Sequence, residues 1–408
     1  MKRDAIESPV PATGARQQLY DRMRPAGLAP LWEVLHALVP PQPAVRSLPA
    51  HWRWADVKPF LEEAGRVITA EEAIRRVLIL ENPGWRGESR VTGTLYAGLQ
   101  LILPGEVAPS HRHVQSALRF VVDGDGAYTA VNGERTIMHP GDFIITPSWT
   151  WHDHGNDGEE PVTWLDGLDI PIVGFFENGF AENDVARSQK VTSAEGTSLA
   201  RYGANMLPLE PLSPFGRTSP IFCYPYARSR EALAHLAAHA PLDPGYGTVL
   251  RYVNPLTGGH AMPTIATQLQ LLPRGFATKA TRTTAGRVFS VVEGDAEVGI
   301  TPAGNAEPVT YRVGPKDHFV VPPWATLVMK SWSSGSWKTM PTRRRTSSRC
   351  SRTTGRPETA TVPEAGVRIP LRCSTSVVLP APLGPSSATR SPGWTCRSAP
   401  SRATCPSG

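Results

Sequence analysis

The chain has 408 residues, of which 40% are hydrophobic and 19% are charged, as in ordinary globular domains. Its net charge of +6 comes from residues 331–408, which hold 12 of the 42 basic residues and only 2 of the 36 acidic ones; the remaining 30 basic and 34 acidic residues exclude a generally basic nucleic-acid-binding surface. No apolar run reaches the roughly 20 residues that cross a bilayer, and the first residues lack the apolar core of a secretory signal, so we expect a cytoplasmic protein.

The N-terminal 76 residues are predicted to be a helical segment. The pattern predicts one helix near Ala15–Met23 and a second near Pro30–Leu38, where a Pro-Pro pair follows. An amphipathic stretch follows over Asp56–Arg76.

From residue 77 the pattern changes to short apolar runs that end in Gly, Pro, Asn or Asp. Runs such as VLILENPG and FIITPSWTWHDH each predict a strand and a turn, and their density predicts an antiparallel barrel or sandwich over residues 77–186. Residues 187–263 form a connection rich in Pro and Gly, with one short helix at Arg228–Ala240. A second strand-rich domain is expected over residues 264–330.

The second strand-rich block repeats the first in outline, which indicates duplication of a domain. The segment Gln268–Val298 aligns with residues 98–128. The second copy has Thr281, Thr283 and Leu327 at positions where the first has histidines. Only the first copy is therefore expected to build an imidazole metal site.

Residues 331–408 form a basic tail rich in Arg, Ser, Thr and Pro, with no helical or strand period. One interpretation is a disordered basic extension. We favour translation in a shifted reading frame of GC-rich DNA, because the tail begins where closing strands of the second barrel are due, and the second domain is then incomplete. Four of the five cysteines lie in this tail; the fifth is Cys223, so the body has neither a disulfide framework nor a thiolate metal site.

Three histidines are the main candidates for a metal site. His111 and His113 stand two apart on a predicted strand and so point to the same face. His152 lies on a later predicted strand that can fold back toward them. Three imidazoles with open coordination positions are typical of a non-haem metal oxygenase rather than a zinc hydrolase.

The first histidine pair matches the first cupin motif, G-x5-H-x-H-x3-E-x6-G. Gly105, His111, His113 and Gly124 stand at the motif's spacing, and Ala117 occupies the Glu position. The motif's fourth metal ligand is therefore missing.

The third histidine matches the second cupin motif, G-x5-P-x-G-x2-H-x3-N. Gly141, Pro147, His152 and Asn156 stand at the motif's spacing, and Trp149 replaces its second Gly. This spacing selects His152 over His154 as the ligand.

With its N-terminal helices and degenerate second repeat, the chain resembles the bicupin ring-cleaving dioxygenases, and above all the gentisate 1,2-dioxygenases. The segments RRVLILENPG, YAGLQLILPGE, HRHVQSALRF and WHDHGN carry the resemblance, which covers roughly residues 15–330. It implies a mainly β bicupin, with two tandem antiparallel jelly-roll barrels, that assembles as a homo-oligomer, often a tetramer. It also implies cleavage of gentisate between C1 and C2 by O2, in aromatic catabolism, to give maleylpyruvate.

Two alternatives to gentisate cleavage stay open. The first, also a ring-cleaving dioxygenase, takes salicylate or 1-hydroxy-2-naphthoate as its substrate; Tyr96, a polar residue on the expected pocket face, favours gentisate over these. The second is a protein of another class, a bicupin isomerase or a small-molecule-binding protein.

The resemblance implies Fe(II) at His111, His113 and His152, although Mn, Ni or Zn fits these ligands as well. Because Ala117 adds no negative charge, the carboxylate and 2-hydroxyl of a 2-hydroxyaromatic acid can complete the coordination. The alternative is a degenerate cupin with weakened metal affinity.

Arg119 shares the strand parity of the histidines and should point into the barrel, where a buried guanidinium needs an anion. The substrate carboxylate is one candidate partner and a structural ion pair is the other. Arg75 is a weaker candidate of the same kind, since Arg76 beside it is an equal choice.

The remaining candidates come from the resemblance, each against the alternative of wall packing or a plain loop residue. Tyr96, Gly98 and Gln100 alternate on one strand face, where the resemblance implies that they line the pocket, give room to the ring and form hydrogen bonds. The other three are His154 near the metal and two substrate-binding residues, Gln115 and Asp166.

Overall fold

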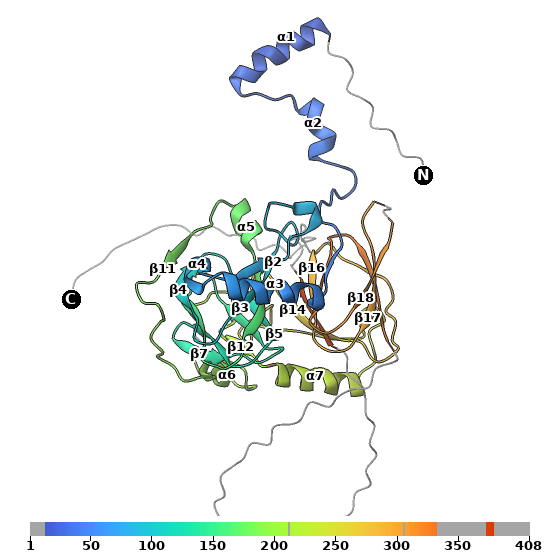
Figure 1. Ribbon diagram of the computed structural model, residues 1–408. Helices are drawn as coiled ribbons and strands as arrows, with labels where there is room; N and C mark the ends of the chain where they lie inside the picture. The colour runs from blue at the N-terminus through green and yellow to red at the C-terminus, as the bar shows by residue number, and fades with distance from the viewer. Residues whose placement is uncertain (1–12, 211–212, 305–306, 333–372, 379–408) are drawn as a thin grey trace, which may run out of the picture.

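The computed structural model describes residues 13–210, 213–304, 307–332 and 373–378, which form a mainly β protein. Two groups of strands lie side by side, one built mainly by the first half of the chain and one mainly by the second (Figure 1). Each group contains a six-stranded sheet and a smaller sheet. The predicted fold class, mainly β with two strand-rich halves and N-terminal helices, is confirmed.

The helices lie in the N-terminal segment, after β10 and in the connection between the halves. Their bounds are α1 Gly14–Met23, α2 Leu31–Leu38, α3 Trp54–Val67, α4 Ala70–Ala73, α5 Ile170–Phe175, α6 Thr197–Tyr202 and α7 Tyr226–His239, with 3-10 turns η1 Arg24–Ala26 and η2 Pro83–Trp85. Helices α1 and α2 project away from the sheets in Figure 1 and bury no residue. Within the described residues, the helices are all too short or too polar to span a bilayer.

The first half forms sheets of six and five strands. The six-stranded sheet runs, in spatial order, β12 Cys223–Tyr224, β8 Phe143–Thr146, β5 Ala117–Asp123, β10 Val162–Leu168, β3 Tyr96–Ile102 and β2 Val77–Ile79. The five-stranded sheet runs β11 Ala181–Asn183, β4 Val107–His113, β9 His152–Asn156, β6 Ala127–Val131 and β7 Glu134–Ile137.

The second half repeats this arrangement with sheets of six and four strands. The six-stranded sheet runs β1 Ala50–Trp52, β19 His318–Val321, β16 Arg287–Val291, β21 Cys373–Val378, β14 Ala266–Leu271 and β13 Thr248–Arg251. The four-stranded sheet runs β15 Thr281–Arg282, β20 Thr326–Ser331, β17 Ala296–Thr301 and β18 Val309–Val313. The central strands β19, β16, β21 and β14 take the places of β8, β5, β10 and β3. The repeat in sequence predicts this correspondence for β19, β16 and β14 but not for β21.

The two six-stranded sheets bury both of their faces. Leu99 and Leu118 of the first sheet belong to the same apolar cluster as Leu269 and Val288 of the second. The alternate residues of these strands face the interior of their own half. Strands buried on both faces need no polar alternation, which explains their nearly continuous apolar runs.

The stretch Asp56–Arg76, expected as one amphipathic patch, is divided in the structure. Helix α3 ends at Val67, and α4 begins after Thr69, whose side chain accepts a hydrogen bond from the backbone N–H of Glu72. This capping interaction starts a new, short helix. Arg75 and Arg76 lie beyond it, directly before β2.

The connection over residues 187–263 contributes more than the one expected helix. Strand β12 pairs with β8 of the first half, and β13 pairs with β14 of the second. Helix α7 joins both halves, because the backbone N–H of Tyr226 donates to Asp142 and the Arg230 side chain donates to Glu293. The connection therefore holds the two halves together.

One strand of the tail is described. Strand β21 pairs with both β14 and β16, where the sequence pattern gave no sign of a strand. Both interpretations of the tail concern residues that otherwise lie outside the described ranges, and they stay predictions.

Gly155 of β9 has no room for a side chain, because a Cβ there would lie 2.4 Å from the Tyr128 ring. The Arg135 guanidinium stacks on that ring 3.5 Å from its centroid and hinders its movement. We expect Gly155→Ala to lower the free energy of unfolding by roughly 1–3 kcal/mol, measured by urea denaturation. Gly174→Ala, at an exposed position of α5 with nothing within 4 Å, is the control and should be neutral or slightly stabilising; equal destabilisation by both changes would contradict the packing argument.

Asp317 connects the N-terminal segment to the second half, since it accepts hydrogen bonds from His51 at 3.1 Å and from the backbone N–H of Trp54 at 2.8 Å. Burial acts to raise the pKa of this carboxyl, but the hydrogen bonds outweigh it and hold the pKa below its ordinary value. A carboxyl with a depressed folded pKa stabilises the fold above its unfolded pKa of about 3.9, and that stability is lost as pH falls through the folded pKa.

Asp317→Asn should therefore cost about 1–3 kcal/mol at pH 7, and the difference from the parent protein should shrink as the pH falls below about 4. Denaturant unfolding of both proteins at several pH values measures it. The control is Asp157→Asn, at an exposed carboxylate paired with Arg135. A cost that does not vary with pH would show that the carboxylate charge contributes nothing.

Candidate metal centre and substrate pocket

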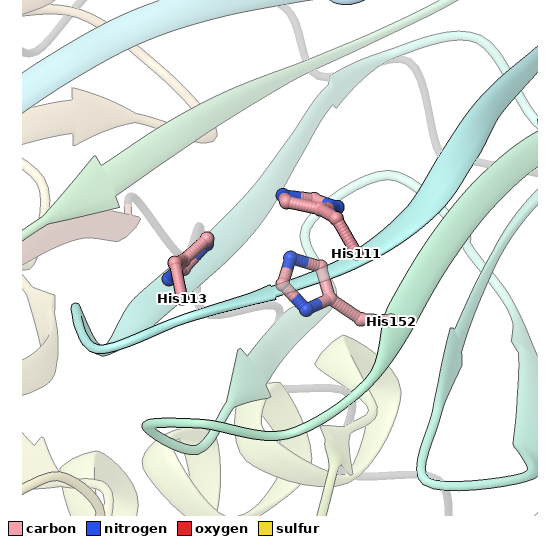
Figure 2. Close-up of side chains that lie close together, drawn as sticks. All are labelled: His111, His113 and His152. Atoms are coloured by element: carbon pink, nitrogen blue, oxygen red, sulfur yellow. The ribbon is translucent and has the colours of Figure 1, made fainter. Parts of the chain in front are cut away.

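His111, His113 and His152 come together inside the first half, as the sequence predicts (Figure 2). The two former lie on β4 and the third on the neighbouring strand β9, where His111 and His152 are direct cross-strand partners. One ring nitrogen from each lies within 4.8 Å of the others.

The hydrogen bonds of two of these rings set the tautomer that binds a metal. His113 Nδ1 donates to the carbonyl of Gln115 at 2.8 Å, and His152 Nδ1 donates to the carbonyl of Thr150 at 2.9 Å. A carbonyl only accepts, so Nδ1 carries the proton and Nε2 keeps its lone pair. His152 Nε2 is buried without a hydrogen-bond partner. The residues present thus fit a metal ion, which would satisfy this atom.

All three imidazoles are held neutral, the protonation state in which they can coordinate a metal. Burial, followed by the charge of Arg75, lowers the pKa of His111 to about 2. Burial lowers the pKa of His113 to about 4 and that of His152 well below its ordinary value.

Arg75 faces this site and Arg76 does not, which decides between two residues that are equal choices in the sequence. Arg75 donates to the carbonyl of Pro109 at 2.9 Å and to His111 Nδ1. Arg76 instead forms two hydrogen bonds of 2.8 Å with Glu106 on the other side of the chain. The same nitrogen of Arg75, Nη2, also lies 3.3 Å from His111 Nε2, so this contact does not fix the tautomer of His111. The Nη1 of Arg75 is buried without a partner.

A second charged group lies on the six-stranded sheet. Arg119 is 3% exposed, donates to Thr146 at 2.6 Å, and places Nε 3.6 Å from a carboxylate oxygen of Asp166. This Nε has no hydrogen-bond partner, so the guanidinium is only partly satisfied. Burial raises the pKa of Asp166 to about 6, against the opposing charge of Arg119.

Gly98, Asp166 and Arg119 are direct neighbours across β3, β10 and β5. A Cβ on Gly98 would lie 3.0 Å from the hydroxyl of Tyr96 and 2.5 Å from Val77. Burial and the charge of Asp166 raise the pKa of Tyr96, so its phenol stays protonated.

Gln100, two residues further along β3, is buried at 2% exposed. Gln115 lies two residues beyond the end of β4. Its side-chain amide nitrogen is close to Gly179, since a Cβ built on Gly179 would lie 3.2 Å from it. Its backbone carbonyl, rather than its amide, holds His113.

His154 is fully buried on β9, two residues beyond His152. Its Nδ1 lies 2.9 Å from the hydroxyl of Thr129, which itself donates to Met138 Sδ at 3.2 Å. The hydroxyl therefore accepts from Nδ1, which leaves Nε2 as an acceptor without a partner. Burial, followed by the charges of Arg119 and Arg75, lowers the pKa of His154 and keeps it neutral.

Two residues that contact the site are not predicted by the sequence, Thr129 and Thr146. They orient His154 and Arg119, but a threonine on a strand carries no signal of such a role.

Trp149, which stands in place of a Gly of the second cupin motif, adopts φ +58°, the left-handed conformation that the motif's Gly usually supplies. Its ring packs 4.6 Å from Phe180 and 4.5 Å from the Arg112 guanidinium, contacts that offset the strain.

The comparisons with known proteins agree with this geometry. Residues 98–168 match the family model described as Cupin domain. The chain is 54% identical over 312 residues to gentisate 1,2 dioxygenase 1 from Aquipseudomonas alcaligenes, covering 76% of this chain and 88% of that protein. It is 36% identical to a gentisate 1,2-dioxygenase from Ralstonia sp, covering 78% and 87%.

Among solved structures, a salicylate 1,2-dioxygenase from Pseudaminobacter salicylatoxidans superposes with a TM-score of 0.74 at 29% identity, covering 91% of this chain and 95% of that one. The same enzyme has been solved as an adduct with gentisate, again with a TM-score of 0.74. The cupin match, together with 54% identity over 88% of the length of a curated gentisate 1,2-dioxygenase, places this chain in the gentisate 1,2-dioxygenase family of ring-cleaving cupin dioxygenases.

Proposed function

We propose that the protein cleaves gentisate between C1 and C2 with O2 to give maleylpyruvate, using Fe(II). The observation that carries this proposal is the set of three neutral imidazoles, without a carboxylate ligand, opposite the buried cation Arg119. The family relationship supports the reaction. A homotetramer in the cytoplasm is part of the same proposal. The first half, residues 77–186, is the catalytic cupin domain in this proposal.

His111, His113 and His152 would hold the metal. When bound, Fe(II) supplies open coordination positions for the substrate's carboxylate and 2-hydroxyl and for dioxygen, and it couples the two reactants electronically. Ala117, in the place of the motif's Glu, is 1% exposed and adds no charge or ligand atom, which favours a chelating anion as the substrate.

Arg119 and Arg75 bind the substrate carboxylate in this proposal. Arg119 has an unpartnered Nε, and Arg75 has an unpartnered Nη1, so each offers a donor to an anion without losing an existing hydrogen bond. The other terminal nitrogen of Arg75, Nη2, contacts the His111 ring, and this contact would have to open for His111 to hold a metal. Asp166 keeps Arg119 in place and balances part of its charge.

His154, Tyr96 and Gln100 contact the ring and its polar groups. The free Nε2 of His154 accepts the proton of a ring hydroxyl, because Thr129 holds the proton on Nδ1. Tyr96 has a protonated phenol and donates. Gly98 lets Val77 and the Tyr96 hydroxyl lie close to β3, where a Cβ would clash with both, and so shapes this wall of the site. Gln115 lines the entrance in this proposal.

Cleavage of salicylate or 1-hydroxy-2-naphthoate is the second candidate, supported by the structural likeness to a salicylate 1,2-dioxygenase. These acids lack the 5-hydroxyl that makes gentisate electron-rich. A bicupin isomerase or small-molecule-binding protein would not consume oxygen with any of the three acids.

Oxygen uptake tests the function and the metal together. We expect protein loaded anaerobically with Fe(II) to consume one O2 per gentisate, with slower uptake on salicylate and 1-hydroxy-2-naphthoate. His152→Ala should lose its iron and at least about 100-fold of its activity, whereas His235→Ala, on the exposed face of α7, should retain both. Metal analysis of the purified proteins separates iron loss from misfolding, and the absence of uptake with every acid would refute the proposal.

The role of Arg119 predicts a specific kinetic change. Arg119→Lys keeps the charge but removes the planar pair of donors, so KM for gentisate should rise by about 10-fold or more, with less change in kcat. The control is Arg53→Lys, which breaks a similar pair with Asp56 on the surface. If KM stayed unchanged in Arg119→Lys, a structural ion pair with Asp166 would be its whole role.

A further inference from the structure

The second half contains a cavity of about 370 Å³ on its six-stranded sheet, lined mainly by β13, β14 and β16. Its described lining residues all belong to the second half or to the connection, and none of them is part of the histidine cluster of the first half. Its lining among the described residues runs from the exposed Arg251 to the buried Gln270, Arg287 and Phe289. A volume of this size accommodates a small organic molecule.

Arg287 is the exceptional residue of this cavity. It is 3% exposed, yet its Nε and Nη2 have no hydrogen-bond partner, and none of the ion pairs in the described part of the chain includes it. Burial lowers the pKa of Arg287 to about 10, which leaves it charged at neutral pH. A buried, unpaired cation is costly, so a fold that retains one needs an anion to offset it.

The two free nitrogens form the side of the guanidinium that takes a carboxylate elsewhere in this protein. Arg53 binds Asp56 through Nε and Nη2, both at 2.7 Å, and Arg230 binds Glu293 through the same two atoms at 2.7 and 3.1 Å. This edge matches the two oxygens of a carboxylate. On Arg287 the same edge is free.

The other walls fit the remainder of a small carboxylic acid. The Phe289 ring lies 5.6 Å from the guanidinium carbon of Arg287, and Val249 adds an aliphatic wall. Thr283 and Gln270 add neutral polar groups. One buried guanidinium with apolar walls suits a carboxylate on a carbon skeleton better than a phosphate, for which several cations or a nest of backbone N–H groups is usual.

The position of Arg287 in the internal repeat supports this reading. In the aligned sequences it falls on Ala117, next to the metal ligands of the first half, and Thr283 falls on His113. The second half thus has a fixed cation where the first has a site for a metal ion. We propose that the cavity of the second half is a binding site for a small organic carboxylate, held by the Nε and Nη2 of Arg287.

This second site does not depend on the reaction proposed for the first half. Its ligand could be an aromatic acid or an aliphatic diacid, so two probes distinguish them: benzoate, which lacks a 2-hydroxyl, and maleate. Equilibrium dialysis of the anaerobic holoenzyme counts the ligands bound per chain. We expect Arg287→Met to bind one fewer than the parent protein, for benzoate, maleate or both, and the probe that shows the loss identifies the class.

Two further variants keep the test decisive. Val249→Trp fills the cavity without changing the charge and should cause the same loss of one ligand. Arg53→Met, which removes a surface guanidinium, should bind as the parent does. Without ligand, Arg287→Met should melt at a higher temperature than the parent, because an unpaired buried charge is gone. Equal stoichiometry for the parent, Arg287→Met and Val249→Trp with both probes would overturn the proposal, as would a failure of the parent to bind either.

Discussion

The burial of both faces of the two six-stranded sheets is the constraint on which the rest of the molecule depends. Leu99 and Leu118 on one sheet, with Leu269 and Val288 on the other, form a shared apolar cluster. Because this contact supplies apolar burial on the outer faces, the inner faces can carry polar and charged side chains at a stability cost the fold tolerates. Arg119 and Arg287 both stand on such inner faces, on equivalent strands β5 and β16.

The inner face of the first half accumulates positive charge without an anionic metal ligand to balance it. Arg75 and Arg119 lower the pKa of His111 and His154, after burial, and Asp166 is the one carboxylate that opposes both arginines in the described residues around the site. A dication held by three neutral imidazoles would add to this excess. An anionic substrate therefore contributes attraction as well as ligand atoms, which explains physically why the Glu of the motif is absent in a site for aromatic acids.

Much of this could be predicted from sequence, and the failures have identifiable causes. The grouping of His111, His113 and His152 follows from strand parity and motif spacing. The choice between Arg75 and Arg76 does not, because it depends on where α4 ends and β2 begins. A shift of one residue would turn the other arginine toward the histidines. The edge strands β1 and β12 are two or three residues long and pair far along the chain, so no local pattern predicts them. Thr129 and Thr146 contribute only by their hydrogen bonds to His154 and Arg119, which the sequence does not show.

The two halves answer the same physical problem in different ways. Both enclose polar residues between a six-stranded and a smaller sheet, and each interior contains a polar group that has no hydrogen-bond partner among the described residues. In the first half, His152 Nε2 is an unpartnered acceptor that a cation would satisfy; in the second, the Arg287 guanidinium is an unpartnered donor that an anion would satisfy. Replacement of the histidines by Thr281 and Thr283 removes the metal ligands, and Arg287 at the position of Ala117 restores the charge. The loss of metal ligands in the second copy therefore need not mean the loss of a binding function, because the preference for an anionic partner survives the change in chemistry.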